Sequence, residues 1–228
     1  MKTSHILLGI ITIVTLTGMV ATDVLLKQQF DKLDWSNPNQ DFERRPLPTA
    51  SHLVIDASPA AEIVVEGNVK TATALVNPAY GLLYHTRQQG DTLFITFTPD
   101  YEGEHQPRND AFHELGVGLL LQLPTVRSLR ITNGRLTLKH VSTPDLALSL
   151  RNTRLRTNHM TVSGPLSLSI SQHSFAVLGT DRYQSLRLVV QDSSGVQLNN
   201  TDYETFLPTI SPNAEVALSG QALRWLAK

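Results

Sequence analysis

The sequence lacks cysteine entirely, and it carries few aromatic side chains and almost no net charge. Without any Cys among its 228 residues, the chain has no disulfide bond, no thiolate nucleophile and no cysteine-ligated metal site. Aromatic residues make up 6% of the chain, and 19 Lys and Arg stand against 20 Asp and Glu, for a formal charge of −1. A chain so nearly neutral has no general attraction for nucleic acid or anionic lipid. We therefore expect no nucleic-acid partner.

Long hydrophobic runs are also missing, except for one at the amino terminus. Residues 6–21 are uncharged and mostly apolar, and the run extends to Leu26 if Asp23 lies near the membrane surface. A spanning helix needs about 20 such residues, and the core of a signal peptide needs about 7–15. The one plausible cleavage position follows Ala21, where Met19 fits poorly as the third residue before the cut. We predict a membrane anchor in residues 1–26, binding the membrane through residues 6–26, with a cleaved signal peptide as the alternative.

Two polar segments divide the remainder of the chain. Residues 27–48 contain several prolines and predict a linker, which leaves residues 49–228 as the folded body. Short apolar runs in the body indicate β-strands, and no window after residue 50 has the apolar period of an amphipathic helix. Residues 99–116 interrupt the strands with acids and histidines that have no fixed ligand spacing. We expect a mobile charged loop there, with metal ligation as the alternative.

Residues 126–218 contain a repeat of about 20 residues. One apolar anchor position recurs with spacings of 19, 20, 20 and 20 residues, at Ile131, Leu150, Ile170, Val190 and Ile210. Residues two and four positions before the last four anchors are also apolar, the alternation of a strand with one buried face. A second apolar pair follows each turn, for example Leu136 with Leu138, and Phe175 with Val177. This self-similarity predicts a solenoid of stacked coils.

The turns and second strands of the repeat distinguish between two solenoids of this period. A leucine-rich repeat needs a helical segment in each coil, which the alternating second half of this repeat does not provide. We therefore predict an all-β fold, a parallel β-helix of about 20 residues per rung, preceded by one amino-terminal helix. A polar residue two positions after each anchor predicts a left-handed corner with these side chains in one column. They are Asn133, Asn152, Gln172 and Asp192.

Four segments of the chain resemble a known family. They are residues 26–34 (LKQQFDKLD), 52–56 (HLVID), 91–95 (DTLFI) and 192–198 (DSSGVQL). Together they are similar to bacterial envelope proteins of the auto-transporter adhesin, head GIN domain type, a domain of unknown function. The resemblance implies a β-helical body, a place in the cell envelope and no known catalytic residues. With the predicted anchor, we expect inner-membrane attachment with the body in the periplasm, or export to the cell surface if the amino-terminal segment is cleaved.

The outward positions of the repeat contain no Asp or Glu on the first strand of each coil. Two positioned carboxylates are the usual minimum for glycoside hydrolysis. We therefore predict a module that is not an enzyme and that needs no cofactor or metal. An adhesion-like or scaffolding role in the envelope follows, with an envelope glycan or protein as partner. The alternatives are a glycan-acting envelope enzyme and a purely structural spacer.

Basic residues are concentrated between residues 127 and 156, where seven Lys or Arg accompany one acid, Asp145. Six of them are candidates for binding an anionic glycan or lipid headgroup: Arg130, Arg135, Lys139, Arg151, Arg154 and Arg156. A solvated face, with arginine stems lying on the sheet, is the alternative. His140 and His159 are 19 residues apart and therefore occupy one position on neighbouring coils. Because a third ligand is missing, they predict an exposed ladder rather than a metal site.

Overall fold

A computed structural model describes residues 2–32, 34, 37–57, 62–97 and 116–227. The chain forms two compact units, Met1–Asp41 and Phe42–Lys228. The first unit contains helix α1 (Lys2–Phe30), and the second contains all the strands. Apart from α1 and two short 3₁₀ segments, the regular structure of the described residues is β.

Helix α1 continues to Phe30, beyond Leu26, where the anchor was predicted to end. Its stretch Leu7–Phe30 is long and apolar enough to cross a membrane, because 24 residues at about 1.5 Å each exceed the hydrocarbon core of about 30 Å. Four threonine hydroxyls donate to the carbonyl one turn earlier at 2.8–2.9 Å: Thr12, Thr15, Thr17 and Thr22. The surface of the helix is therefore largely apolar, and these four threonine hydroxyls already donate hydrogen bonds within the helix.

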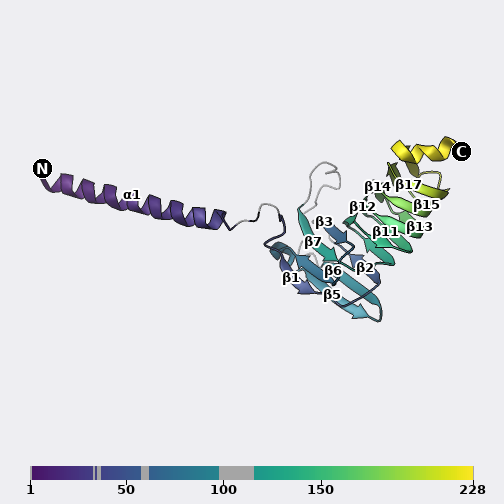
Figure 1. Cartoon of the computed structure of the whole chain (residues 1–228), viewed down its shortest axis with the longest axis horizontal. Helices are drawn as coiled ribbons and strands as arrows, with labels where there is room; N and C mark the ends of the chain where they lie inside the picture. Colours follow the sequence, from purple (N-terminus) through teal and green to yellow (C-terminus); the bar gives the residue numbers. More distant parts are fainter. Residues whose placement is uncertain (1, 33, 35–36, 58–61, 98–115, 228) are drawn as a thin grey trace. The chain divides into compact units, whose positions relative to one another are not determined.

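The second unit consists of two nine-stranded sheets that mix parallel and antiparallel pairs (Figure 1). Sheet A contains, in spatial order, β1 (Glu43–Pro46), β4 (Thr73–Val76), β7 (Val117–Gln122), β3 (Glu62–Glu66), β9 (Arg135–Lys139), β12 (Arg154–Asn158), β14 (Phe175–Leu178), β16 (Gly195–Asn199) and β18 (Glu215–Ser219). Sheet B contains β17 (Asp202–Ile210), β15 (Arg182–Val190), β13 (Thr161–Ser171), β11 (Leu146–Arg151), β8 (Ser128–Thr132), β2 (His52–Asp56), β6 (Thr92–Phe97) and β5 (Tyr84–Gln89), with β10 (Ser142–Thr143) beside β13. Segment η2 (Gly220–Ala227) follows the last strand at the yellow end of Figure 1.

The predicted register of the repeat is confirmed. Strands β8, β11, β13, β15 and β17 pair in parallel and align the anchors. Leu150 pairs with both Ile131 and Ile170, and Val190 pairs with both Ile170 and Ile210. The first four anchors are at most 1% exposed, whereas Ile210, on the edge strand, is 45% exposed. The second strand of every repeat lies in sheet A, so each repeat, called a coil below, contributes one strand to each sheet.

The face predicted for the second strand of the third coil is wrong. Phe175 was expected to point into the core, but it is 41% exposed, and Ala176 and Leu178 are buried instead. The preceding turn has two left-handed residues, Gln172 with φ 56° and His173 with φ 60°. This turn is one residue longer than those before it, and a shift of one residue exchanges the two faces of a strand.

The strands that precede the repeat do not continue its stacking order. In sheet B, β2 lies between β6 and β8. In sheet A, β3 lies between β7 and β9. The expectation of an all-parallel body is wrong for three strands, because β1 and β5 are antiparallel to their neighbours and β4 is antiparallel to both β1 and β7. Strands β5 and β6 form a hairpin whose turn contains Gly90 at φ 60°, a conformation that glycine adopts without steric cost.

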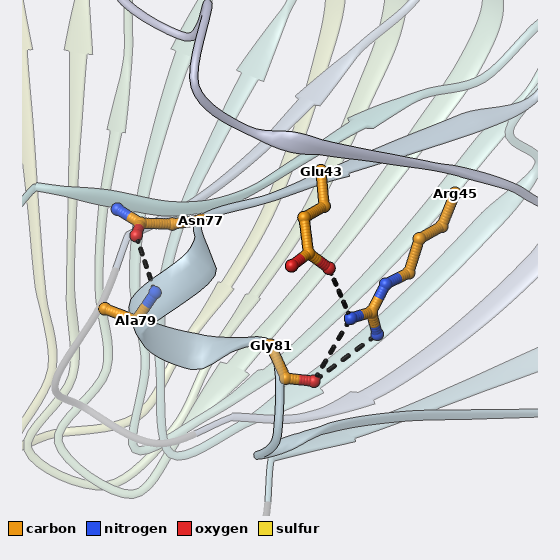
Figure 2. Close-up of polar contacts among 5 residues, drawn as sticks. All are labelled: Glu43, Arg45, Asn77, Ala79 and Gly81. Atoms are coloured by element: carbon orange, nitrogen blue, oxygen red, sulfur yellow. Dashed lines mark hydrogen bonds and ion pairs between the residues drawn. The ribbon is translucent and has the colours of Figure 1, made fainter.

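Strand β1 lies within the segment predicted to be a linker, and an arginine holds it to the folded unit. Both terminal nitrogens of Arg45 donate to the carbonyl oxygen of Gly81 at 3.4 Å, and Nη2 also bonds Oε2 of Glu43 at 2.7 Å (Figure 2). Asn77 caps the short segment η1 (Pro78–Tyr80) that leads to Gly81. These contacts tie β1 to the connection between β4 and β5.

Candidate functional site

Left-handed residues form one corner of the coils, as the sequence predicted. Asn133, Asn152, Gln172 and Asp192 have φ angles between 47° and 57°. The side-chain amide of Asn152 donates to Oδ1 of Asn133 at 2.9 Å, and the backbone N–H of Gln172 donates to Oδ2 of Asp192 at 3.0 Å. The column therefore links consecutive coils to one another, which is a structural role.

A buried carboxylate near the opposite corner was not identified from the sequence. Asp181 is 4% exposed and accepts hydrogen bonds from the backbone N–H groups of Met160 at 2.8 Å and Gly179 at 3.1 Å. It also accepts from the hydroxyls of Tyr183, at 2.9 Å, and Thr157. Burial, together with the negative charge of Asp181, raises the pKa of Tyr183 well above its ordinary value. With four donors and no exposed face, Asp181 fixes the corner and is not placed to act on a ligand.

The six basic candidates lie on two different sheets and do not form one strip. Arg130 and Arg151 are on β8 and β11 of sheet B. The other four are on β9 and β12 of sheet A: Arg135, Lys139, Arg154 and Arg156. The two groups therefore have different neighbours.

Glutamates border the group on sheet A. Arg135 pairs across the sheet with Glu62, and Lys139 pairs with Glu66. Opposite charges in directly paired positions attract each other and reduce the field of the cations. Glu62 also accepts a hydrogen bond from the hydroxyl of Thr137, which places its carboxylate on the outer face of β9. These neighbours favour the solvated-face interpretation for the sheet A group.

Small residues occupy the outer positions between the arginines of sheet B. The outer positions of β11 and β13 carry Ala147, Ser149, Ser167, Ser169 and Ser171, and exposed arginines flank them: Arg130, Arg151 and Arg187. We call these eight residues the arginine–serine face. Among the residues that the structure describes, none of the three arginines forms an ion pair. The face is therefore cationic, with no carboxylate to offset it between β8 and β15.

One constellation with the elements of nucleophilic chemistry lies where β2, β6 and β8 meet. His52 Nδ1 is 2.7 Å from Ser128 Oγ, and His52 Nε2 is 3.8 Å from Asp91 Oδ2. Hydrogen bonding from Ser51, whose backbone N–H donates to Asp91 Oδ1 at 3.0 Å, holds the pKa of Asp91 below its ordinary value. Asp91 is therefore ionised at neutral pH and can orient the imidazole. No sequence motif indicates this group, because Ser128 and His52 are 76 residues apart.

The histidine ladder is confirmed. The rings of His140 and His159 stack with centroids 5.6 Å apart and 24° between their planes. Glu66 approaches His140 Nδ1 at 3.9 Å. In the part of the chain that the structure describes, no group of three His, Asp or Glu side chains is placed to hold a metal ion. The predicted charged loop lies almost entirely in residues 98–115, outside the described residues.

Comparison with known proteins finds similarity in structure only. No protein-family model and no curated protein sequence matches the chain. A "putative adhesin" from Parabacteroides distasonis ATCC 8503 superposes with a TM-score of 0.55 and 12% identity, over 77% of this chain and 73% of that chain. For a "putative adhesin" from Parabacteroides merdae ATCC 43184 the TM-score is 0.42 and the identity 8%, over 78% of this chain and 95% of that chain. A "putative lipid binding protein" from Parabacteroides distasonis ATCC 8503 has a TM-score of 0.35 and an identity of 12%, over 80% of this chain and 96% of that chain. The first similarity shows that the chain shares its fold with that protein.

Proposed function

We propose that the chain is a membrane-anchored, extracytoplasmic β-helix of the cell envelope that acts in adhesion or scaffolding rather than catalysis. The observation that carries the proposal is the parallel pairing of five consecutive coils, each giving one strand to each sheet. Such a column presents two broad outer faces to a partner. In this proposal the antiparallel strands β1, β4 and β5 close the amino-terminal end of the column.

The proposed location follows from α1. A helix of this length and apolarity, with its threonine hydroxyls bonded internally, is suited to a lipid environment. We place the anchor in the inner membrane and the body in the periplasm, with cell-surface exposure as the alternative if the segment is cleaved. Membership of the head GIN type of envelope protein is part of the same proposal.

Two observations support adhesion as the role. The protein from Parabacteroides distasonis that shares the fold is named a "putative adhesin". The arginine–serine face contains no carboxylate, so it lacks the acid pair that glycoside hydrolysis ordinarily requires. A surface of this kind can hold a ligand without reacting with it.

A glycan array probed with the full-length chain in zwitterionic nanodiscs tests the proposal. We expect retention of at least one class of envelope glycan, with no shortened product when the bound glycan is analysed by mass spectrometry. Retention of no glycan and no envelope protein would contradict the binding role, and appearance of cleaved glycan would establish an enzyme.

The enzyme alternative has one specific observation in its favour, the contact between Ser128 and His52. If Ser128 Oγ donates its proton to His52 Nδ1, then the Nε2–H group points towards Asp91, as in an activated nucleophile. A fluorophosphonate probe would label Ser128 in an enzyme of this type and would leave a Ser128→Ala variant unlabelled. Because the adhesion proposal assigns no nucleophile, it predicts no labelling in either protein.

A further inference from the structure

We propose that the arginine–serine face of sheet B binds an anionic polysaccharide that lies across the strands. The inference rests on the proposed role as a binding module, and it names the ligand class and the surface. It selects one of the two groups of basic residues and adds Arg187, which lies outside the cationic stretch of the sequence.

The charge of the arginine–serine face favours an anionic ligand. Arg130, Arg151 and Arg187 are exposed, and none forms an ion pair with another described residue. A guanidinium without a protein partner keeps its paired N–H donors free for a carboxylate or sulfate. On sheet A, by contrast, Arg135 and Lys139 have Glu62 and Glu66 as direct neighbours. An anion therefore gains more by binding to sheet B than to sheet A.

The surface between the arginines also suits a sugar polymer. Ser149 pairs with Arg130 on one side and Ser169 on the other, and Ser167 pairs with Ala147 and Arg187. The serine and alanine side chains are short, so a ligand can approach the strands closely between the arginines. Serine hydroxyls both donate and accept hydrogen bonds, which suits the hydroxyl groups of a sugar.

Spacing favours a polymer over a small anion. Strands β8 and β15 are separated by β11 and β13, so Arg130 and Arg187 lie about 14 Å apart across the sheet at the usual strand spacing of about 4.8 Å. One monosaccharide does not bridge that distance, whereas several units of a polysaccharide do. Binding through several weak contacts on one chain raises the overall affinity without a deep pocket.

The composition of the face also argues against two other polyanions. An anionic membrane surface is ordinarily bound with the help of apolar or aromatic side chains that insert between lipids, and the positions between the arginines are occupied only by serine and alanine. Single-stranded nucleic acid needs aromatic stacking, and the arginine–serine face contains no aromatic residue.

The test measures binding of the full-length chain, in zwitterionic nanodiscs, to immobilised polygalacturonate. The double variant Arg130→Ser/Arg151→Ser removes two cations from the face and leaves the small-residue surface continuous. Its matched control, Lys139→Ser/Arg156→Ser, removes two cations from sheet A. We expect about a tenfold loss of affinity in the first variant and less than about a twofold loss in the second. Salt of about 0.5 M should weaken the parent's binding strongly.

Further arms separate the alternatives. Neither the parent nor any variant should bind dextran, a neutral polymer. Adding Arg187→Ser to the sheet B double variant should reduce the affinity for polygalacturonate further. Equal losses from the sheet B and sheet A variants would overturn the inference, as would binding to vesicles of phosphatidylserine that depends on Arg130 and Arg151. Retention of neutral glycans alone would overturn the inference while leaving the proposed binding role intact. An unchanged urea unfolding transition in both double variants establishes that any loss is local.

Discussion

Asn152 combines a strained backbone conformation with a hydrogen bond between coils. Its φ is 47°, and its side-chain amide donates to Asn133 at 2.9 Å. Replacing it by Ala removes the hydrogen bond and leaves a residue that tolerates a positive φ poorly. We expect Asn152→Ala to lower the free energy of unfolding by about 1–3 kcal/mol, measured by urea denaturation. Asn152→Gly also loses the hydrogen bond but adopts a positive φ without strain, so it should lower the free energy of unfolding by less than Asn152→Ala does. An equal or larger decrease for Asn152→Gly would show that backbone strain does not account for the effect.

Tyr84 has a buried hydroxyl with no hydrogen-bond partner among the described residues. Burial raises its pKa from 10.0 to about 12, despite the opposing charge of Arg45. The folded state holds the phenolic proton of Tyr84 more tightly than the unfolded state does, so this contribution to the free energy of unfolding is complete below pH 10. The contribution is lost as the pH rises towards 12, by up to roughly 2–3 kcal/mol. We expect Tyr84→Phe to stabilise the protein by about 1 kcal/mol at neutral pH and to remove this part of the alkaline loss, as followed by urea denaturation at several pH values.

A second tyrosine provides the control. The hydroxyl of Tyr203 donates to the carbonyl oxygen of Ala222 at 2.8 Å, so Tyr203→Phe loses a hydrogen bond. This substitution should destabilise the protein by about 1 kcal/mol. If both substitutions lowered the free energy of unfolding, the hydroxyl of Tyr84 would have a hydrogen-bond partner that stabilises it.

At the scale of the strand, Leu150 tests whether the stacked anchors stabilise the sheets. It is 1% exposed and pairs with anchors on both sides. Leu150→Ala should lower the free energy of unfolding by about 2–5 kcal/mol, the range for a buried aliphatic side chain. Ser149→Ala, on the outer face of the same strand, should change it by less than about 0.5 kcal/mol. Thermal unfolding of the two variants measures the difference, and similar values would refute the assignment of the faces.

The elements that could be predicted from the sequence are those with strict periodicity. The anchors alternate with polar residues, and only one register buries them all, so the pairing of β8, β11, β13 and β15 follows from the sequence. The face of β14 could not be predicted, because His173 gives no clear signal that it adopts a positive φ. The antiparallel strands were missed because their pairing depends on the path of the chain between β3 and β6, which short-range patterns do not determine.

The candidate sites were less predictable than the fold. The sequence identified the cationic stretch, but it could not separate Arg130 and Arg151 from the residues that face Glu62 and Glu66, because those glutamates reach the stretch only through β3. Arg187 joined the face through the pairing of β13 with β15. Neighbours within a repeat can be read from its period, whereas neighbours supplied by an earlier segment require the sheet order.

For the whole molecule, helix α1 predicts how the protein behaves on fractionation. The stretch Leu7–Phe30 is apolar and of membrane-spanning length, and Met19 fits poorly as the third residue before a cut after Ala21. We expect the full-length protein to remain with membranes after washes with high salt or alkaline carbonate, and detergent to release it. Soluble protein whose amino terminus begins at Thr22 would identify the segment as a cleaved signal peptide.

The position of β2 inside sheet B has a consequence for how the chain folds as it is made. Its partners arrive late: Thr92, which pairs with His52, comes 40 residues later, and Ser128 comes 76 residues later. A chain that emerges amino terminus first therefore leaves both edges of β2 open until β6 is available and one edge open until Thr132 is available, and open edges pair with other chains. Closing these long loops is slow, whereas each later coil adds to a finished template. Nascent chains that end before Thr132 should consequently need chaperone protection, and those that extend beyond it should grow coil by coil without a further slow step.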